Sequence, residues 1–262
     1  MKNIAEHIEK LNQSGKKALS IFLTAGFPQK NNFTELALSI LDSGADMLEI
    51  GIPFSDPLAD GPTIQSSSHT ALENGVTVKD VLNYCEIVKS KTDKPLILMG
   101  YANPMLKYGM KDFCKDAENA GVSGIITPDV PLEEYDSFYS DEFKNFDKIL
   151  LTTPTSSDDR IKQIDDKSEG FVYCVSVTGT TGSRTNFNES VFKNLERTYS
   201  LVKKNKMMIG FGISSPENIK QFSQFCDGVI VGSAIIKKVK EKQNISEIEE
   251  FVHSLNQACI KR

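Results

Sequence analysis

The sequence lacks tryptophan, close cysteine pairs, basic blocks and apolar runs long enough to span a membrane. Its five scattered cysteines do not have the spacing of zinc sites or redox motifs, and we interpret them as small core residues in a reducing compartment. His7, His69 and His253 have no partner at metal or triad spacing, so we expect surface positions and no metal site. With 30 basic and 35 acidic residues and a net charge of -5, nucleic acid and membrane surfaces are poor partners.

The remaining composition is that of a globular protein. Of 262 residues, 25% are charged and 39% are hydrophobic, which excludes disordered and low-complexity classes. The first residues, MKNIAEHIEK, contain acids and no apolar run, unlike a secretory signal or a transit peptide. We therefore expect a cytoplasmic location.

Short runs of β-branched and aromatic residues alternate with longer segments of helical periodicity along the chain. Eight such runs begin at Leu19, Met47, Pro95, Gly124, Lys148, Phe171, Met207 and Asp227. Nearly continuous apolar strands, each followed by a helix, are typical of a parallel sheet covered by helices. We predict one (β/α)₈ TIM barrel domain over residues 1–262, with an extra N-terminal helix indicated by Ile4, Ile8 and Leu11. An open doubly wound sheet is the alternative, but its GxGxxG motif is missing after the first strand.

Two helix starts are visible in the sequence. Thr77 and Asp80 form a T-x-x-D capping pattern, and Ser215 precedes a proline in the first turn of another predicted helix. Both patterns place helices after predicted strands, as the barrel requires.

The first candidate site lies in the segment LEIGIPFSDPLADGPTIQ. With strand period two, Leu48 and Ile50 face the helices and Glu49 faces the barrel interior. Burial raises the pKa of a carboxyl group, and an acid poised nearer neutrality can give and take protons. The alternatives are an internal ion pair or a strand register shifted by one residue. Asp56 and Asp60 in the following loop are further candidate carboxylates, or turn residues that bond their own backbone.

The second candidate site is a set of glycine turns after the last three predicted strands. Gly182 follows the sixth strand, Gly212 the seventh, and Gly232 with Ser233 the eighth. Exposed amides in turns that lead into helices can hold a phosphate, and late barrel strands frequently build such a site. Turn geometry alone is the simpler explanation for any single glycine.

Other side chains near the predicted barrel mouth have weaker signals. Tyr173 faces the same way as Phe171 and Val175 and is either core or a substrate contact. Tyr101, Asn103, Asp129 and Arg184 also follow predicted strands; turns or solvated positions are sufficient explanations for them.

These motifs resemble one known family over nearly the whole chain. FLTAGFP, LEIGIPFSDPLADGPTIQ, MGYANPM, PDVPLEE, VTGTTG, GFGIS and VGSAI, in this order, are similar to the tryptophan synthase alpha subunit family. The resemblance implies a TIM barrel lyase of tryptophan biosynthesis that cleaves indole-3-glycerol phosphate to indole and glyceraldehyde 3-phosphate by a retro-aldol reaction. It implies no cofactor in this chain and a beta subunit partner with pyridoxal phosphate, in an alpha2beta2 complex that receives the indole through a tunnel.

The resemblance also implies roles for individual residues. Glu49 matches the general acid/base and Asp60 the second catalytic carboxylate. Substrate-contacting positions match Phe22, Tyr101, Tyr173, Thr181 and Phe211. The phosphate cradle matches Gly182, Gly212, Gly232 and Ser233. The surface that meets the beta subunit matches Phe54, Asp56 and Pro57.

One departure and two other functions remain open at this point. Val177 stands where many relatives have a basic residue, which leaves loop dynamics and coupling to the partner open. The alternatives are another phosphate-binding barrel lyase or isomerase acting on a sugar phosphate, and a non-catalytic regulatory subunit. The first would not require an indole ring, and the second would bind ligand without turnover.

Overall fold

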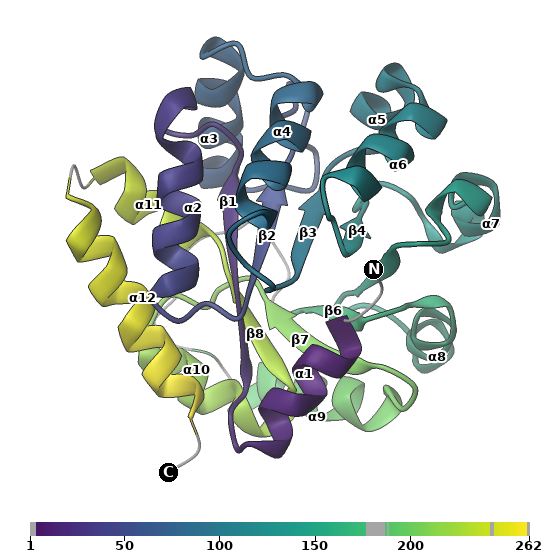
Figure 1. Cartoon of the computed structure of the whole chain (residues 1–262). Coiled ribbons are helices and arrows are strands. Elements are labelled where there is room, and N and C mark those ends of the chain that lie inside the picture. Colours follow the sequence, from purple (N-terminus) through teal and green to yellow (C-terminus); the bar gives the residue numbers. More distant parts are fainter. Residues whose placement is uncertain (1–3, 177–186, 188, 242–243, 261–262) are drawn as a thin grey trace.

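The computed structural model describes residues 4–176, 187, 189–241 and 244–260 (Figure 1). Its strands pair in parallel and in sequence order, and β8 pairs with β1 to close the barrel. The strands are β1 (Ala18–Thr24), β2 (Met47–Gly51), β3 (Leu96–Met99), β4 (Gly124–Ile126), β5 (Asp147–Thr152), β6 (Phe171–Val175), β7 (Lys206–Gly210) and β8 (Gly228–Val231). The predicted (β/α)₈ barrel is therefore confirmed.

Helices surround this barrel (Figure 1). The α-helices are α1 (Ile4–Gln13), α2 (Phe33–Asp42), α3 (Pro62–Glu73), α4 (Val78–Lys89), α5 (Ala102–Tyr108), α6 (Met110–Asn119), α7 (Tyr135–Phe138), α8 (Asp158–Lys167), α9 (Glu189–Leu201), α10 (Pro216–Phe222), α11 (Ser233–Glu241) and α12 (Ile245–Cys259). Short 3₁₀ helices are η1 (Lys30–Asn32), η2 (Leu132–Glu134), η3 (Asp141–Phe143) and η4 (Ser223–Phe225). None of the helices in the described ranges is long and apolar enough to cross a membrane.

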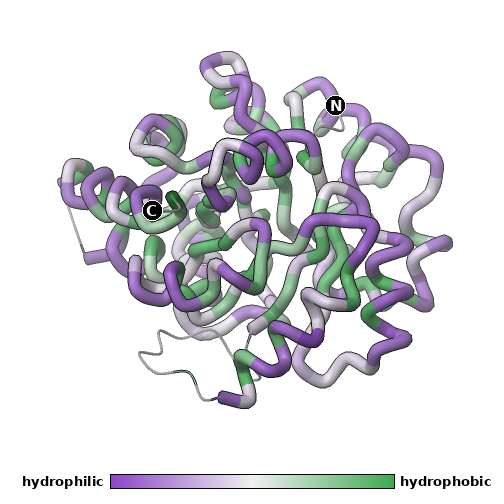
Figure 2. Tube along the Cα trace, turned by 90° about the horizontal axis from the view of Figure 1, so that it is seen from below, coloured by the Kyte–Doolittle hydropathy of each residue, from purple (hydrophilic) through white to green (hydrophobic). Residues whose placement is uncertain are grey.

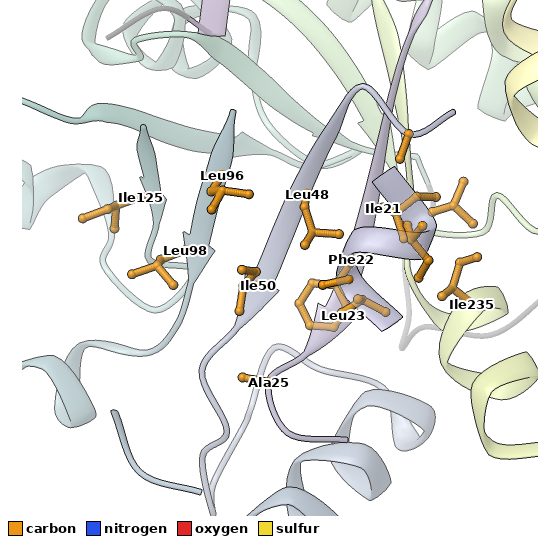
Figure 3. Close-up of a cluster of buried hydrophobic side chains, with 14 of the residues drawn as sticks. Ile21, Phe22, Leu23, Ala25, Leu48, Ile50, Leu96, Leu98, Ile125 and Ile235 are labelled. Carbon is orange, nitrogen blue, oxygen red and sulfur yellow. The ribbon is translucent and has the colours of Figure 1, made fainter. Parts of the chain in front are cut away.

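The apolar core has two parts because side chains alternate across each strand. Leu48 and Ile50 of β2 join an outer cluster between strands and helices, together with Leu96 and Leu98 of β3 (Figure 3). Met47 belongs instead to the inner cluster, which fills the barrel. Hydrophobic residues accordingly gather in the central strands, while the outer turns are largely hydrophilic (Figure 2).

Helix α1 is the predicted extra helix, and it packs against the inner cluster. Ile4 and Ile8 are fully buried among the inward side chains of the strands. A Cβ atom on Gly124 of β4 would lie 2.7 Å from Cδ1 of Ile4, so the absence of a side chain there lets α1 approach. The helix therefore completes the barrel core.

Both predicted helix starts are present. Thr77 and Asp80 form a reciprocal capping box at α4, and the Ser215 hydroxyl accepts a hydrogen bond from the Asn218 amide at α10. The five cysteines are buried and unpaired, as predicted.

The expected surface position was wrong for one histidine. His69 and His253 are exposed, but His7 is half-buried, with Nε2 3.0 Å from the Asp46 carbonyl oxygen. The reason is that α1 packs against the barrel, so its polar face also meets protein.

Candidate active site

A cavity opens where several strands end. It encloses about 550 Å³ of empty space, including its mouth. The lining residues come from β1, β3, β6 and β8 and from the segments that follow β2, β7 and β8: Phe22, Asp60, Ile64, Met99, Tyr173, Phe211, Gly212, Ile213, Ser214, Ile230, Gly232, Ser233 and Ala234. Carboxyl ends of barrel strands are the usual place of active sites in this fold.

Glu49 lies inside the barrel and is not among the residues that line this cavity. It shares the inward face of β2 with Met47, is completely buried, and is the register partner of Phe22 on β1. Its Oε1 accepts a 2.9 Å hydrogen bond from the Ser20 hydroxyl, and Oε2 has no partner among the described residues. Burial raises the pKa of Glu49 to about 8, although the Ser20 hydrogen bond acts in the opposite direction. The inward orientation predicted from strand period is confirmed, and no ion pair neutralises the carboxyl within the described chain.

Asp60 reaches the cavity from the loop after β2. Its Oδ2 accepts a 3.0 Å hydrogen bond from the Tyr101 hydroxyl, which in turn accepts one from the Ala59 amide. The side chain is therefore held by Tyr101 and not by its own backbone. Burial raises the pKa of Asp60 to about 6, and the Tyr101 hydrogen bond opposes that rise.

Tyr173 and Phe211 form an aromatic wall of the cavity. Their rings meet edge to face, with centroids 6.0 Å apart and an interplanar angle of 75°. Phe211 has a φ of 67°, a conformation that is rare for a bulky residue, and its carbonyl accepts a hydrogen bond from the Ser176 hydroxyl. A Cβ atom on Gly210 would lie 2.1 Å from the Tyr173 hydroxyl oxygen, so Gly210 makes room for that side chain.

The part of the lining that follows β7 and β8 suits an anion. Gly232 and Ser233 lie at the start of α11, where first-turn amides and the helix dipole favour negative charge. Gly212, with a φ of 79°, lines the same cavity from the turn after β7. The structure thus brings three of the four predicted phosphate residues to one place.

Other predicted site residues lie either outside the described residues or outside the cavity lining. Thr181 and Gly182, like Arg184 and Val177, lie outside the described residues. Asp56 is exposed in the loop after β2 and does not line the cavity; Phe54 stacks on Tyr101 with ring centroids 5.3 Å apart.

Sequence reasoning missed Ser20 and several apolar lining residues. Ser20 lies two residues before Phe22, so strand period places it inside the barrel as well. The other missed residues include Ile64, Met99 and Ile230, which look like ordinary core residues in sequence. Asp129, one of the weaker candidates, accepts hydrogen bonds from the Ala102 amide at the start of α5. Within the described ranges, no three His, Cys, Asp or Glu side chains gather as they would around a metal ion.

Known proteins match this chain over almost its whole length. The family profile described as Tryptophan synthase alpha chain matches residues 8–261. The tryptophan synthase alpha chain of Flavobacterium psychrophilum is 42% identical over 245 residues, which are 93% of this chain and 96% of that protein. That of Caldanaerobacter subterraneus subsp. tengcongensis is 41% identical over 266 residues, covering 98% and 99%.

Solved structures agree with these sequence matches. Tryptophan synthase subunit alpha from Legionella pneumophila superposes with a TM-score of 0.87 at 35% identity, covering 99% of this chain and 98% of that one. A chain of Mycobacterium tuberculosis tryptophan synthase gives a TM-score of 0.91 at 29% identity, covering 100% and 99%.

Proposed function

The chain belongs to the tryptophan synthase alpha chain family, and from this premise we propose that it cleaves indole-3-glycerol phosphate to indole and glyceraldehyde 3-phosphate. It acts as a carbon–carbon lyase in tryptophan biosynthesis. The observation that supports this function best is the completely buried Glu49 carboxyl, which has no ion-pair partner among the described residues, next to Phe22 of a cavity that the start of α11 also lines. Family membership favours this function over a sugar-phosphate lyase or a non-catalytic subunit.

The chemistry explains why two carboxyl groups are needed. Cleaving the carbon–carbon bond of a neutral indole would leave an unstabilised carbanion at C3 of the ring. Protonation of C3 first gives an indolenine, whose C=N⁺ group accepts the bonding electrons. The reaction therefore needs an acid near C3, a base near the glycerol hydroxyl and an anion near the ring nitrogen.

We assign the acid and the base to Glu49. With a pKa of about 8, its carboxyl is mostly protonated at neutral pH and donates the proton to C3. The resulting carboxylate accepts the glycerol hydroxyl proton while the carbon–carbon bond breaks and its electrons neutralise the C=N⁺ group. Glu49 ends protonated, as it began. Because Glu49 is completely buried and does not line the cavity, the transfer requires its side chain to turn toward the substrate.

Asp60 is assigned the anion beside the ring nitrogen. Its pKa of about 6 leaves it mostly ionised at neutral pH, and the Tyr101 hydroxyl fixes one of its oxygens. Phe22, Tyr173 and Phe211 would contact the indole, while Gly212, Gly232 and Ser233 would hold the phosphate. We extend the substrate and phosphate sites to Thr181 and Gly182 on the basis of the family motif alone.

A beta subunit partner is part of this proposal. The loop after β2 carries Phe54, Asp56 and Pro57, and the next residue, Leu58, is 91% exposed. Contiguous exposed apolar groups mark contact surfaces, and Leu58 directly follows the partly exposed Pro57 in this loop. We propose that this loop meets the beta subunit in an alpha2beta2 complex in the cytoplasm, and that the pyridoxal phosphate enzyme there joins indole to serine. No cofactor is needed in this chain.

The direct test measures indole release from indole-3-glycerol phosphate by the purified chain, with and without the beta subunit and in the absence of serine. Indole and glyceraldehyde 3-phosphate should form in equal amounts. Glu49→Gln should lower kcat by about 10²- to 10⁴-fold, the usual contribution of a general acid or base, and Asp60→Asn should also slow turnover. Glu35→Gln, an exposed change on α2, is the control and should leave the rate unchanged. No indole in either condition would contradict the proposal.

A further inference from the structure

Ser20 contacts the candidate proton donor from the neighbouring strand. It lies on the inward face of β1 between Ala18 and Phe22, and its side chain is completely buried. A buried hydroxyl in an apolar layer is costly unless it is hydrogen-bonded. Among the described residues, its hydroxyl donates a 2.9 Å hydrogen bond to Oε1 of Glu49. The hydroxyl therefore interacts with the carboxyl and with no other described side chain.

This contact makes the two oxygens of Glu49 different. Oε1 accepts the Ser20 proton, whereas Oε2 is buried without a partner among the described residues. A protonated carboxyl has one oxygen that carries the proton and one that only accepts. Because Oε1 already accepts, the exchangeable proton belongs on Oε2.

We propose that Ser20 is a positioning residue for the cleavage reaction: it holds Oε1, assigns the exchangeable proton to Oε2, and stabilises the carboxylate that remains after proton transfer. This inference rests on the proposed function of Glu49. Ser20 does not line the cavity, so it acts through Glu49 and not on the substrate.

Few other groups in the described chain act on the Glu49 carboxyl. Its register partners, Phe22 on β1 and Ile97 on β3, are apolar. Tyr173 on β6 is a titratable group on which the Glu49 charge acts: burial, together with the nearby Glu49 and Asp60, raises the pKa of Tyr173 well above its usual value. Tyr173 therefore stays neutral over the working pH range. Burial raises the pKa of Glu49, and the hydrogen bond from Ser20 lowers it. A substitution at position 20 therefore removes the effect that lowers this pKa.

The test is the pH dependence of kcat/KM for indole-3-glycerol phosphate in wild type and Ser20→Ala. Loss of a hydrogen bond to a charged group should raise the Glu49 pKa, and with it the alkaline limb, by about one pH unit or more. KM should change little, because the cavity lining is intact. Ser20→Thr retains the hydroxyl and should restore the limb.

Ser168→Ala is the matched control, since Ser168 is equally buried and its hydroxyl bonds the Leu150 amide and the Phe171 carbonyl on other strands. It should lower stability without moving the limb. Infrared titration of the Glu49 carboxyl, identified by its loss in Glu49→Gln, should show the same upward shift in Ser20→Ala.

The outcomes separate this inference from the proposed function. A wild-type chain that releases no indole refutes the function. A wild-type chain that releases indole with an alkaline limb that Ser20→Ala does not move, and with an unchanged carboxyl titration, refutes the role of Ser20 alone. A shift in Ser20→Ala that Ser20→Thr reverses supports the role.

Discussion

Glu49 and Asp60 are both carboxylic acids, but their surroundings separate their protonation states. Glu49 has only one hydroxyl contact inside the barrel, and its pKa rises to about 8. Asp60 lies at the cavity, accepts a hydrogen bond from Tyr101, and has a pKa of about 6. Near neutral pH one is an acid and the other an anion, which is the division of roles that the retro-aldol reaction needs.

The raised pKa of Glu49 predicts a pH-dependent effect of Glu49→Gln on stability. The folded chain retains a proton between about pH 4.5 and about pH 8 that the unfolded chain releases, so wild-type stability falls as the pH rises through this range. Gln cannot ionise, so the variant should be more stable than wild type above about pH 8, by on the order of a few kcal/mol. Thermal unfolding at about pH 5 and about pH 9 measures this. The exposed control Glu35→Gln should show no such gain, and an equal difference at both pH values for Glu49→Gln would contradict the burial argument.

Tyr101→Phe should affect the other carboxyl. The Tyr101 hydroxyl lowers the pKa of Asp60, so its removal should move the acid limb of kcat/KM upward from about pH 6. Kinetics as a function of pH give the limb. Tyr108→Phe is a matched control, because the Tyr108 hydroxyl donates to Asp116 outside the cavity lining and its loss should leave the limb in place. If the acid limb does not move in Tyr101→Phe, the ionisation that this limb reports is not that of Asp60.

At the residue scale, the strand period predicted that Glu49 points into the barrel, but it did not predict that Glu49 contacts Ser20. The alternation of side chains along a strand places Ser20, Phe22 and Glu49 on the inward faces of their strands. Which of them meet depends on the offset between β1 and β2: Glu49 is level with Phe22 in register but bonds Ser20. That offset is a property of the closed sheet and is not visible in either strand alone.

Helix α1 shows how an element outside the catalytic cavity supports the barrel. Ile8→Ala would remove a fully buried side chain from the inner cluster and should destabilise the fold by about 2–5 kcal/mol. Denaturant unfolding measures the loss, and kcat should be retained because α1 does not line the cavity. Ile87→Ala on α4 is the control; its side chain is 40% exposed, and it should cost much less. Equal costs for the two variants would mean that α1 does not stabilise the core.

Elements with a strong local pattern could be predicted, and those without one could not. All the barrel strands and the caps at Thr77 and Ser215 were visible in sequence. The segment between β4 and β5 folds into η2, the four-residue α7 and η3, which are too short to show a helical period. The apolar face of α1 was predicted, but its packing site was not, because periodicity does not specify what a face covers.

At the scale of the whole molecule, barrel closure assembles the cavity. Phe22 on β1 and Ser233 after β8 come from opposite ends of the chain, and the pairing of β8 with β1 brings their strands together. The sequence indicated a barrel from its alternating elements, and the fold rule for active sites then placed the candidate residues at one end. Shape and depth of the cavity depend on side chains such as Ile64 and Met99, for which no sequence signal existed.

The proposed partner surface predicts the effect of Leu58→Asp. Burying a charge in place of the 91% exposed leucine should weaken binding of the beta subunit by about tenfold or more, while indole release by the chain alone should not change. Titration with the beta subunit, followed by sedimentation, measures the affinity. Ile87→Asp introduces the same charge at an exposed apolar position on α4, outside that loop, and should leave the affinity unchanged. Unaltered binding by Leu58→Asp would exclude Leu58 from the interface.

The most direct test of the buried-acid account is the pH profile of kcat/KM for indole-3-glycerol phosphate in the wild-type chain. We predict a bell-shaped profile, with an acid limb near about pH 6 from Asp60 and an alkaline limb near about pH 8 from Glu49. A rate that stays constant well above pH 8 would contradict a protonated Glu49 as the donor to the indole ring.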